Sequence, residues 1–460
     1  MDKNIQLFKK QEKIYPRRVW GRYRKIKWMS MVILLGIYYL APWLRWDRGE
    51  HAPDQAILID MSGRRAYFFN IEIWPQEVYY ITGILILAAV GLFFVTSLFG
   101  RVWCGYACPQ TVWTDLFVWV ERIVQGDRNA RKKLDESPLS LNKIYKKGLT
   151  HLIWIIIGLF TGGAWVFYFN DAPTLFDQIV HFDIPLTVGG WIIALTFSTY
   201  LMAGYAREQV CTYMCPYARF QSAMFDKNTL IIAYDEKRGE PRGHHKAGES
   251  WEGRGHCIDC DSCVLVCPMG IDIRKGLQMD CIACGLCVDA CNNVMDKIGL
   301  PRGLIRYDTE SKQPFNALRP RTFWYGGIIS LVGILMLYSL LTRSPLEMNI
   351  IHDRNPLFVV LSNSEIRNGY NLHILNKSRT DRYYTIGIEG LENANLRIQA
   401  NNEIQNDSLH VFADSLGNFR VFVTAPKQQE IRKEIRFIIK ANDDSEIKES
   451  KETIFVSGSK

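Results

Sequence analysis

The sequence predicts a multi-domain membrane protein that joins an α-helical bundle, a cysteine-rich insert and an all-β C-terminal domain. Three observations lead to this fold class. Long apolar runs recur between residues 28 and 341, eight of the 12 cysteines lie within 257–291, and residues 342–460 alternate apolar and polar positions in short runs. The mean hydropathy of −0.06 averages over these contrasting parts, so each segment is considered separately.

Five apolar runs are long enough to cross a bilayer, which takes about 20 helical residues. They are predicted at 28–46, 78–98, 149–169, 186–206 and 323–341. A single run of this kind is also compatible with a buried core helix. Five in one chain, most with Trp or Tyr near their ends, favour membrane spans, because aromatic side chains concentrate at the membrane interfaces.

Lys and Arg residues are unevenly distributed around these runs. They are dense in 1–27 and between the second and third runs, whereas residues 170–184, between the third and fourth runs, contain none. The positive-inside rule therefore predicts a cytoplasmic N-terminus and places the segment after Leu341 outside. We expect a multi-pass protein of the inner membrane whose C-terminal domain is periplasmic. Because basic clusters beside spans explain the net charge of +8, we expect membrane lipid and no nucleic acid as a partner.

The cysteine-rich insert contains one ligand pattern twice, Cys-x2-Cys-x2-Cys-x3-Cys. This is the spacing of bacterial two-cluster ferredoxins, in which the fourth cysteine of each run ligates the other cluster. The predicted ligands of the first [4Fe-4S] cluster are Cys257, Cys260, Cys263 and Cys291, and those of the second are Cys281, Cys284, Cys287 and Cys267. Zinc sites use paired Cys-x2-Cys units and cytoplasmic disulfides are rare, so both alternatives are disfavoured.

The other four cysteines form two Cys-x3-Cys-Pro motifs beyond the second and fourth spans. They are Cys104, Cys108, Cys211 and Cys215. A spacing of four places two sulfurs on one helix face, and the prolines predict that each second cysteine leaves helical geometry before a new helix begins. The shared motif indicates a weak internal repeat whose ends converge. Four thiolates suit Cu(I), zinc or an iron–sulfur centre, and burial in helix packing without a metal is the alternative.

The C-terminal segment has no cysteine and shows seven or eight short runs of period two, separated by polar residues. This pattern predicts an immunoglobulin-like sandwich that lacks the cysteine pair of antibody domains. The predicted divisions are 1–27, a basic cytoplasmic N-terminus; 28–218, four transmembrane helices with both Cys-x3-Cys-Pro motifs; 219–322, a cytoplasmic ferredoxin-type domain; 323–341, the fifth transmembrane helix; and 342–460, the periplasmic sandwich.

These motifs together resemble the cytochrome c oxidase accessory protein family, the CcoG, FixG and RdxA group. The resemblance rests on "RVWCGYACPQTVWTD", "REQVCTYMCPYARFQSAMFD", the cysteine block from 255 to 307 and a tail that opens at "HDRNPLF". It implies a role in the assembly of cbb3-type cytochrome oxidase, as a cupric reductase that converts Cu(II) to Cu(I) with electrons from the two clusters. It also implies that Cys104, Cys108, Cys211 and Cys215 handle copper, and that oxidase subunits or copper chaperones are partners.

Two other functions stay open from the sequence. One is a general electron-transfer subunit linked to quinol, similar to the accessory proteins of periplasmic nitrate reductase. The other is a scaffold whose sandwich docks assembly partners while the clusters only stabilise the fold. The sequence leaves the electron donor unidentified, and it leaves open whether the chain forms a homodimer.

Overall fold

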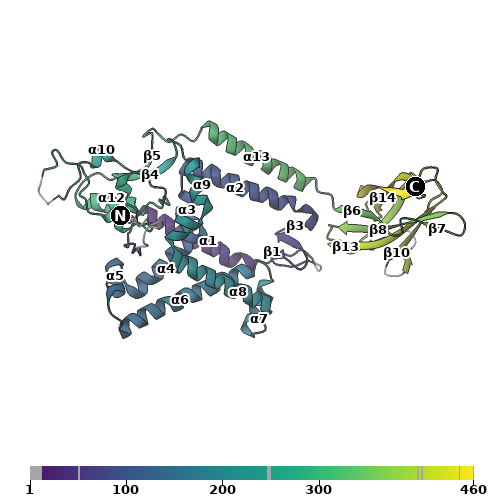
Figure 1. The fold of residues 1–460 in the computed structure, drawn as a ribbon, viewed down its shortest axis with the longest axis horizontal. Coiled ribbons are helices and arrows are strands. Elements are labelled where there is room, and N and C mark those ends of the chain that lie inside the picture. The colour runs from purple at the N-terminus through teal and green to yellow at the C-terminus, as the bar shows by residue number, and fades with distance from the viewer. Residues whose placement is uncertain are drawn as a thin grey trace, which may run out of the picture. The chain divides into compact units, whose positions relative to one another are not determined.

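The computed structural model describes residues 13–49, 52–245, 250–400, 403–405, 408–444 and 446–458. The first twelve residues of the predicted basic N-terminus lie outside these ranges. The chain divides into two compact units, one made of Met1–Arg45 with Gln55–Met336 and the other of Trp46–Asp54 with Leu337–Lys460. Figure 1 shows helices dominating the first unit and strands the second.

The first unit is mainly helical. Its long helices are α1 (Arg22–Leu40), α2 (Tyr79–Phe99), α4 (Pro109–Gln125), α6 (Leu141–Val166), α8 (Leu186–Thr199) and α13 (Pro320–Leu341). Shorter helices are α3 (Val102–Tyr106), α5 (Arg128–Glu136), α7 (Ala172–Val180), α9 (Pro216–Met224), α10 (Glu236–Gly239), α11 (Ser262–Leu265) and α12 (Leu286–Lys297). Strands β1 (Ile57–Asp60), β2 (Arg65–Phe68) and β3 (Ile71–Ile73) form one sheet, and β4 (Leu230–Tyr234) pairs with β5 (Ile305–Thr309).

Within the described residues, five helices are long and apolar enough to cross a membrane, which confirms the five predicted apolar helices. Their ends differ from the prediction. The first begins at Arg22 and not at 28, because Arg24 and Lys27, each only 3% exposed, pair with Asp115 on α4. The third begins at Leu141 and not at 149, where the Ser140 hydroxyl accepts a hydrogen bond from the amide of Lys143 at 3.2 Å.

Small residues bring the third and fourth spans close together. A Cβ at Gly158 would lie 3.1 Å from the Thr196 carbonyl oxygen, and one at Gly162 would lie 2.9 Å from that of Ile192. Glycines four residues apart on one helix face let two backbones approach within a membrane, where apolar burial drives no association. The pair α6 and α8 therefore packs through its glycines.

The cysteine block folds against the start of α1, and Figure 1 shows α12 beside that end of the helix. The antiparallel pair β4–β5 brackets the block, which the sequence did not predict. The core contains Ile232, Tyr234, Ile273, Val288, Met295, Leu304 and Ile305. Asp289 on α12 accepts hydrogen bonds from the amides of Tyr23 and Arg24, so it caps α1.

The second unit is a β-sandwich, as predicted. One six-stranded sheet has the order β11-β10-β13-β8-β6 with β7 paired to β8, and a four-stranded sheet has the order β12-β9-β14-β15. The strands are β6 (Leu346–His352), β7 (Val359–Val360), β8 (Ile366–Asn376), β9 (Arg382–Glu389), β10 (Asn395–Ala400), β11 (Glu403–Gln405), β12 (Leu409–Val411), β13 (Ser415–Ala425), β14 (Arg432–Ala441) and β15 (Lys448–Val456).

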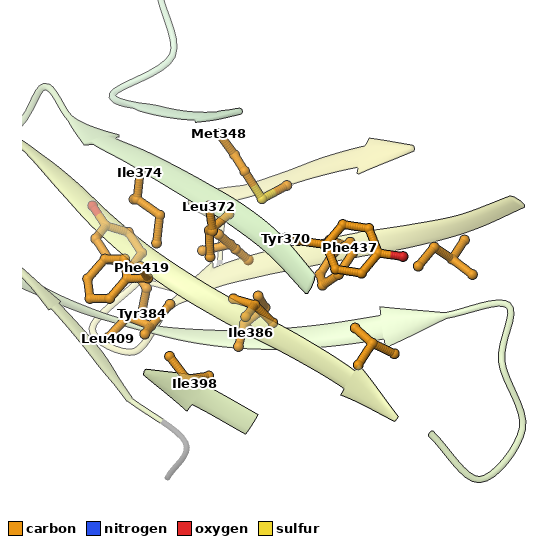
Figure 2. Close-up of a cluster of buried hydrophobic side chains, with 14 of the residues drawn as sticks. Met348, Tyr370, Leu372, Ile374, Tyr384, Ile386, Ile398, Leu409, Phe419 and Phe437 are labelled. Carbon is orange, nitrogen blue, oxygen red and sulfur yellow. The ribbon is translucent and has the colours of Figure 1, made fainter. Parts of the chain in front are cut away.

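Alternate residues of these strands fill the sandwich interior. Figure 2 shows Tyr370, Leu372, Tyr384 and Phe437 of that interior, and each belongs to the cluster of buried apolar side chains. Period-two patterning places successive side chains on opposite faces, so the short alternating runs of the sequence were enough to indicate this architecture.

Replacing Phe437 by Ala should destabilise the sandwich by about 3–5 kcal/mol, because it removes a large side chain from a packed interior. Phe437 is 1% exposed, whereas Phe412 is 58% exposed. Amide hydrogen exchange of β14, measured by mass spectrometry on the full chain, should therefore accelerate in Phe437→Ala and stay unchanged in Phe412→Ala. Equal exchange in the two variants would contradict this packing.

Candidate functional site

The two cysteine loops adopt the same unusual backbone. Asp259 and Ala283 occupy equivalent positions between the first two cysteines of each run and have φ of 53° and 50°. Asp261 and Gly285, each directly after the second cysteine, have φ of 52° and 72°. The left-handed region costs a non-glycine residue about 1–2 kcal/mol. A strain repeated at matched positions marks both loops as functional parts of the chain.

Two cavities lie against these loops. The first, with about 360 Å³ of empty space, is lined by Cys257, Cys260, Cys263 and Cys291. The second, with about 350 Å³, is lined by Cys267, Cys281, Cys284 and Cys287, and Cys263 also borders it. The structure therefore brings together the same two sets of four that the spacing predicts, with the fourth cysteine of each run facing the other run's cavity. Because they share Cys263, the cavities are adjacent.

The donor sets fit iron–sulfur clusters. Burial raises the pKa of Cys263 and Cys291 to about 12 and that of Cys281 to about 11, so these thiols need a bound cation to become thiolates at neutral pH. Among the described residues, no three His, Cys, Asp or Glu side chains are close enough to hold one single ion. In a [4Fe-4S] cluster each cysteine binds a different iron. Bound clusters would supply one-electron transfer at these loops.

Arg274 orders the first loop. Its guanidinium, 8% exposed, contacts the carboxylates of Asp259, Asp261 and Asp272 at 2.5, 2.7 and 2.8 Å. The two loop aspartates are the residues with positive φ, so the ion pairs offset the backbone strain next to the first cavity. The second loop has Ala283 and Gly285 at these positions and is held in another way.

The two Cys-x3-Cys-Pro motifs share one local geometry. Cys108 and Cys215 are extended, with ψ of 128° and 112°, and Pro109 and Pro216 begin α4 and α9, as predicted. Each second cysteine donates its amide to the carbonyl five residues before it, Cys108 to Trp103 at 2.9 Å and Cys215 to Val210 at 2.8 Å. The same wide turn thus closes both motifs, which supports the predicted internal repeat. Cys211 lies on a π-helix, Val210–Met214.

The first motif contacts the second cysteine loop directly. A Cβ at Gly105 would lie 2.7 Å from the Ile282 carbonyl oxygen and 3.0 Å from the Cys284 Cα. The Tyr106 hydroxyl donates to the Cys284 carbonyl at 3.0 Å. Cys104 packs against the buried apolar cluster that includes Cys284. The backbone beside the second cavity therefore touches the backbone between Cys104 and Cys108. These two cysteines and Cys211 and Cys215 are called the membrane-edge thiols below.

Arg101 joins this loop to the second motif. Its guanidinium donates to the carbonyls of Met279 and Cys281 on the loop and to that of Ala218 on α9. Its charge also acts on the thiols of Cys104 and Cys211. A buried cation placed here favours thiolate formation and binding of anionic ligand sets.

The four membrane-edge thiols are neighbours in space. Burial raises the pKa of Cys104 to about 11 and that of Cys211 to about 12, and charge on the other cysteines of the set raises both further. The Gln221 side chain lies 3.4 Å from the Cys104 sulfur through its Nε2 atom. These thiols are neutral at pH 7 until a cation offsets their desolvation.

Sequence reasoning missed several residues of this site. Gly105 and Tyr106 lie inside the first motif, but the second motif has Thr212 and Tyr213 there, and Tyr213 is exposed. The two motifs therefore differ at these two positions, and this difference could have indicated that the first motif makes a contact that the second lacks. Arg101 and Gln221 carried no signal, because the hydrogen bonds that link them to this site join residues more than 100 positions apart.

Three known families match separate parts of the chain. The family described as "4Fe-4S binding domain" matches residues 81–126, "4Fe-4S dicluster domain" matches 206–310, and "IG-like fold at C-terminal of FixG" matches 336–458. These matches confirm the predicted iron–sulfur binding and the immunoglobulin-like C-terminal domain.

Full-length relatives are also similar. "Nitrogen fixation protein FixG" of Rhizobium meliloti is 48% identical over 478 residues, covering 95% of this chain and 91% of that protein. "Protein RdxA" of Cereibacter sphaeroides is 47% identical over 433 residues, covering 92% and 91%. The solved structure of a FixG-related protein from Vibrio parahaemolyticus is 22% identical, with a TM-score of 0.22, and covers 25% of this chain and 97% of its own.

Replacing Gly105 by Ala should loosen the second cysteine loop, because the added methyl group collides with backbone atoms that cannot move aside independently. We expect a cost of about 1–3 kcal/mol, the usual range for overpacking. Iron loss to a chelator should then be about 5- to 150-fold faster. Gly163→Ala is the matched control, since a Cβ there meets nothing within 4 Å. Equal chelator resistance in the two variants would refute the contact.

The crossed ligand pattern predicts which cluster each fourth cysteine serves. Cys291→Ser should leave the same EPR spectrum as Cys257→Ser, because both remove a ligand of the first cluster. Cys267→Ser should instead match Cys284→Ser. An uncrossed pattern would exchange these pairings, so comparison of the four reduced spectra decides between them.

Proposed function

The chain belongs to the FixG and RdxA family, and from this premise we propose that it reduces Cu(II) to Cu(I) for the assembly of a cbb3-type cytochrome oxidase. It is a membrane-associated protein of the 4Fe-4S type. The proposed route leads from the two cysteine cavities to Cys104, Cys108, Cys211 and Cys215, where copper binds as the substrate.

The contact between the second cysteine loop and the first Cys-x3-Cys-Pro motif carries this proposal. Gly105 lies against the backbone of Ile282 and Cys284, and Tyr106 donates to the Cys284 carbonyl. Electron transfer slows steeply as donor and acceptor separate, so a backbone contact between the two cysteine settings provides a short path. The shared border at Cys263 supports a second short path between the two cavities.

The chemistry of the thiols suits copper as a substrate. Cu(II) gains one electron to become Cu(I), and soft sulfur ligands stabilise the product ion more than the reactant. Cys104 and Cys211 lose their protons when copper binds, because the cation offsets the desolvation of each thiolate. Arg101 lies beside both thiols and offsets the excess negative charge of a site made of thiolates.

Sidedness and partners belong to the same proposal. The basic segment 13–27 contacts both the basic segment 128–147 and the cysteine block, because the Tyr15 hydroxyl donates to Asp135 and the Arg17 amide donates to the Leu265 carbonyl. The positive-inside rule therefore supports a cytoplasmic cysteine block. An odd number of spans then puts the sandwich in the periplasm. We assign to the sandwich the docking of an oxidase subunit or a copper chaperone.

A variant with Cys104, Cys108, Cys211 and Cys215 all replaced by Ser should lose Cu(II) reduction while it keeps both clusters. The measurement is anaerobic reduction of Cu(II) by the prereduced full chain, followed with a Cu(I)-specific chelator, and EPR verifies the clusters. Met214→Leu is the control: it changes a neighbouring soft side chain within the second motif, and it should reduce copper at the native rate.

Copper reduction at the native rate by the four-serine variant would refute the thiols as the copper site. It would also mean that the clusters reduce copper without a dedicated site, in favour of a general electron-transfer function.

A further inference from the structure

A cavity separate from the cysteine loops lies between α4, α6 and the end of the fourth span. Its volume of about 590 Å³ falls within the range of about 300–1000 Å³ for small-molecule pockets. Part of its lining is apolar and aromatic, at Trp154, Leu201 and Tyr205, and His151 also contributes to it. The rest is strongly charged and comprises Lys13, Glu121, Lys147, Arg207 and Glu208. Aromatic walls with converging polar groups are typical of a cofactor or substrate site.

His151, Trp154 and Tyr205 form the aromatic wall. The rings of His151 and Tyr205 are nearly parallel, 14° apart with centroids at 6.0 Å, and Trp154 is perpendicular to His151 at 5.2 Å. His151 Nδ1 lies 3.0 Å from the Tyr200 hydroxyl. The wall therefore offers flat faces for stacking on a ring and a hydrogen-bonded His–Tyr pair that can exchange protons with a ring hydroxyl.

The backbone at the cavity is distorted. The fourth span ends in a π-helix, Tyr200–Ala206, and Arg207 follows with φ of 38°. The Arg207 side chain is held by Glu121 at 2.6 Å, and Glu121 also binds Arg131 at 2.8 Å. π-helical turns and left-handed non-glycine residues cost free energy and concentrate at functional sites. Beside them Gly204 packs closely on the Trp154 ring, since a Cβ there would lie 3.1 Å from it.

The cavity has a membrane side and a cysteine side. Leu201 and Tyr205 belong to the fourth span and are 44% and 54% exposed, so an apolar ligand can enter from the bilayer. Arg207 and Glu208 line both this cavity and a smaller one that also contacts Cys211, Met269 and Ile282. The two residues thus form the partition between the cavity and the second cysteine loop.

We propose that this cavity binds the headgroup of a membrane quinol and that the quinol is the electron donor. The inference rests on the proposed function, because it supplies the electrons of that reaction. Both O–H bonds of the quinol break, leaving the quinone, two electrons and two protons. The His151–Tyr200 pair accepts the protons and passes them to water at the open mouth, and clusters held by the two cysteine loops would each take one electron. A two-electron donor explains why the chain holds two one-electron carriers next to each other.

The test measures cluster reduction by quinol without any copper. The oxidised full chain, with both clusters intact, receives menadiol anaerobically, and the cluster absorbance and EPR signals are followed. His151→Phe should reduce its clusters about 100-fold more slowly, the effect expected when a proton-accepting group is removed. Its affinity for a hydroxyquinoline N-oxide, a quinol analogue, should fall at least about tenfold. Reduction by dithionite should be unchanged.

Two further variants make the result interpretable. Tyr200→Phe keeps the ring and removes the hydroxyl that meets His151. It should show the same defects in smaller measure. It therefore tests the proposal even where His151→Phe fails to fold. His181→Phe makes the identical substitution at an exposed histidine far from the cavity lining and should match the native protein.

Equal quinol reduction in the native chain and both cavity variants would overturn the proposal, as would a native chain that neither binds the analogue nor accepts electrons from menadiol. Displacement of the analogue by phospholipid as readily as by menadione would identify the cavity as a lipid seat and overturn it too. Because copper is absent, a failed copper site leaves this assay intact, and the variant with the four membrane-edge cysteines replaced by Ser should still accept electrons from quinol.

Discussion

Asp289 accepts hydrogen bonds from the amides of Tyr23 and Arg24, at 3.2 and 2.8 Å, and so caps the first membrane helix from within the cysteine block. These amides have no partner inside α1, and a carboxylate at this place stabilises a helix by about 0.5–2 kcal/mol. The same bond fixes α12, which carries Cys287 and Cys291, to the helix bundle. Close approach is possible because Gly21 and Gly285 lack side chains: a Cβ on either would lie within 2.6 Å of its neighbour. The contact between α12 and α1 therefore keeps the second cysteine loop against Gly105. The short distance between that loop and the membrane-edge thiols depends on it.

Buried charges hold the surrounding helices in place. Asp115 on α4 joins Arg24 and Lys27 on α1, and Glu121, also on α4, joins Arg131 and Arg207. Breaking such a buried set by removing one partner costs about 3–5 kcal/mol, because a charge is left without compensation. Apolar spans gain little from packing against one another in lipid, so paired charges and close glycine contacts carry the specificity instead. Helix α4 is thereby bound both to α1 and to the end of the fourth span, and its Glu121 also lines the cavity that contains His151.

The two cysteine loops reach the same backbone in different ways, and the difference has a functional meaning. The first loop is ordered by its own ion pairs through Arg274, and Cys260 within it is exposed. The second loop is ordered by the bundle through Arg101 and Tyr106. Tyr307 on β5 also holds it, with its hydroxyl donating to the Ala283 carbonyl at 2.6 Å. The loop that the membrane helices hold is thus the second one, which is the arrangement that the proposed copper reduction requires.

The sequence by itself determined the parts of this protein that depend on short-range chemistry. Spacing within each cysteine run selected the cluster type, run length and hydropathy located the five apolar helices, proline placed the extended turn at Cys108 and Cys215, and period-two alternation indicated the sandwich. Tertiary structure decided what depends on residues far apart in the chain. Gly105 against Cys284, Asp289 on α1, the pairing of β4 with β5, and His151 with Tyr200 each join segments that carry no mutual pattern. Local spacing encodes the geometry of one turn or one helix face, whereas these contacts arise only when separate elements pack.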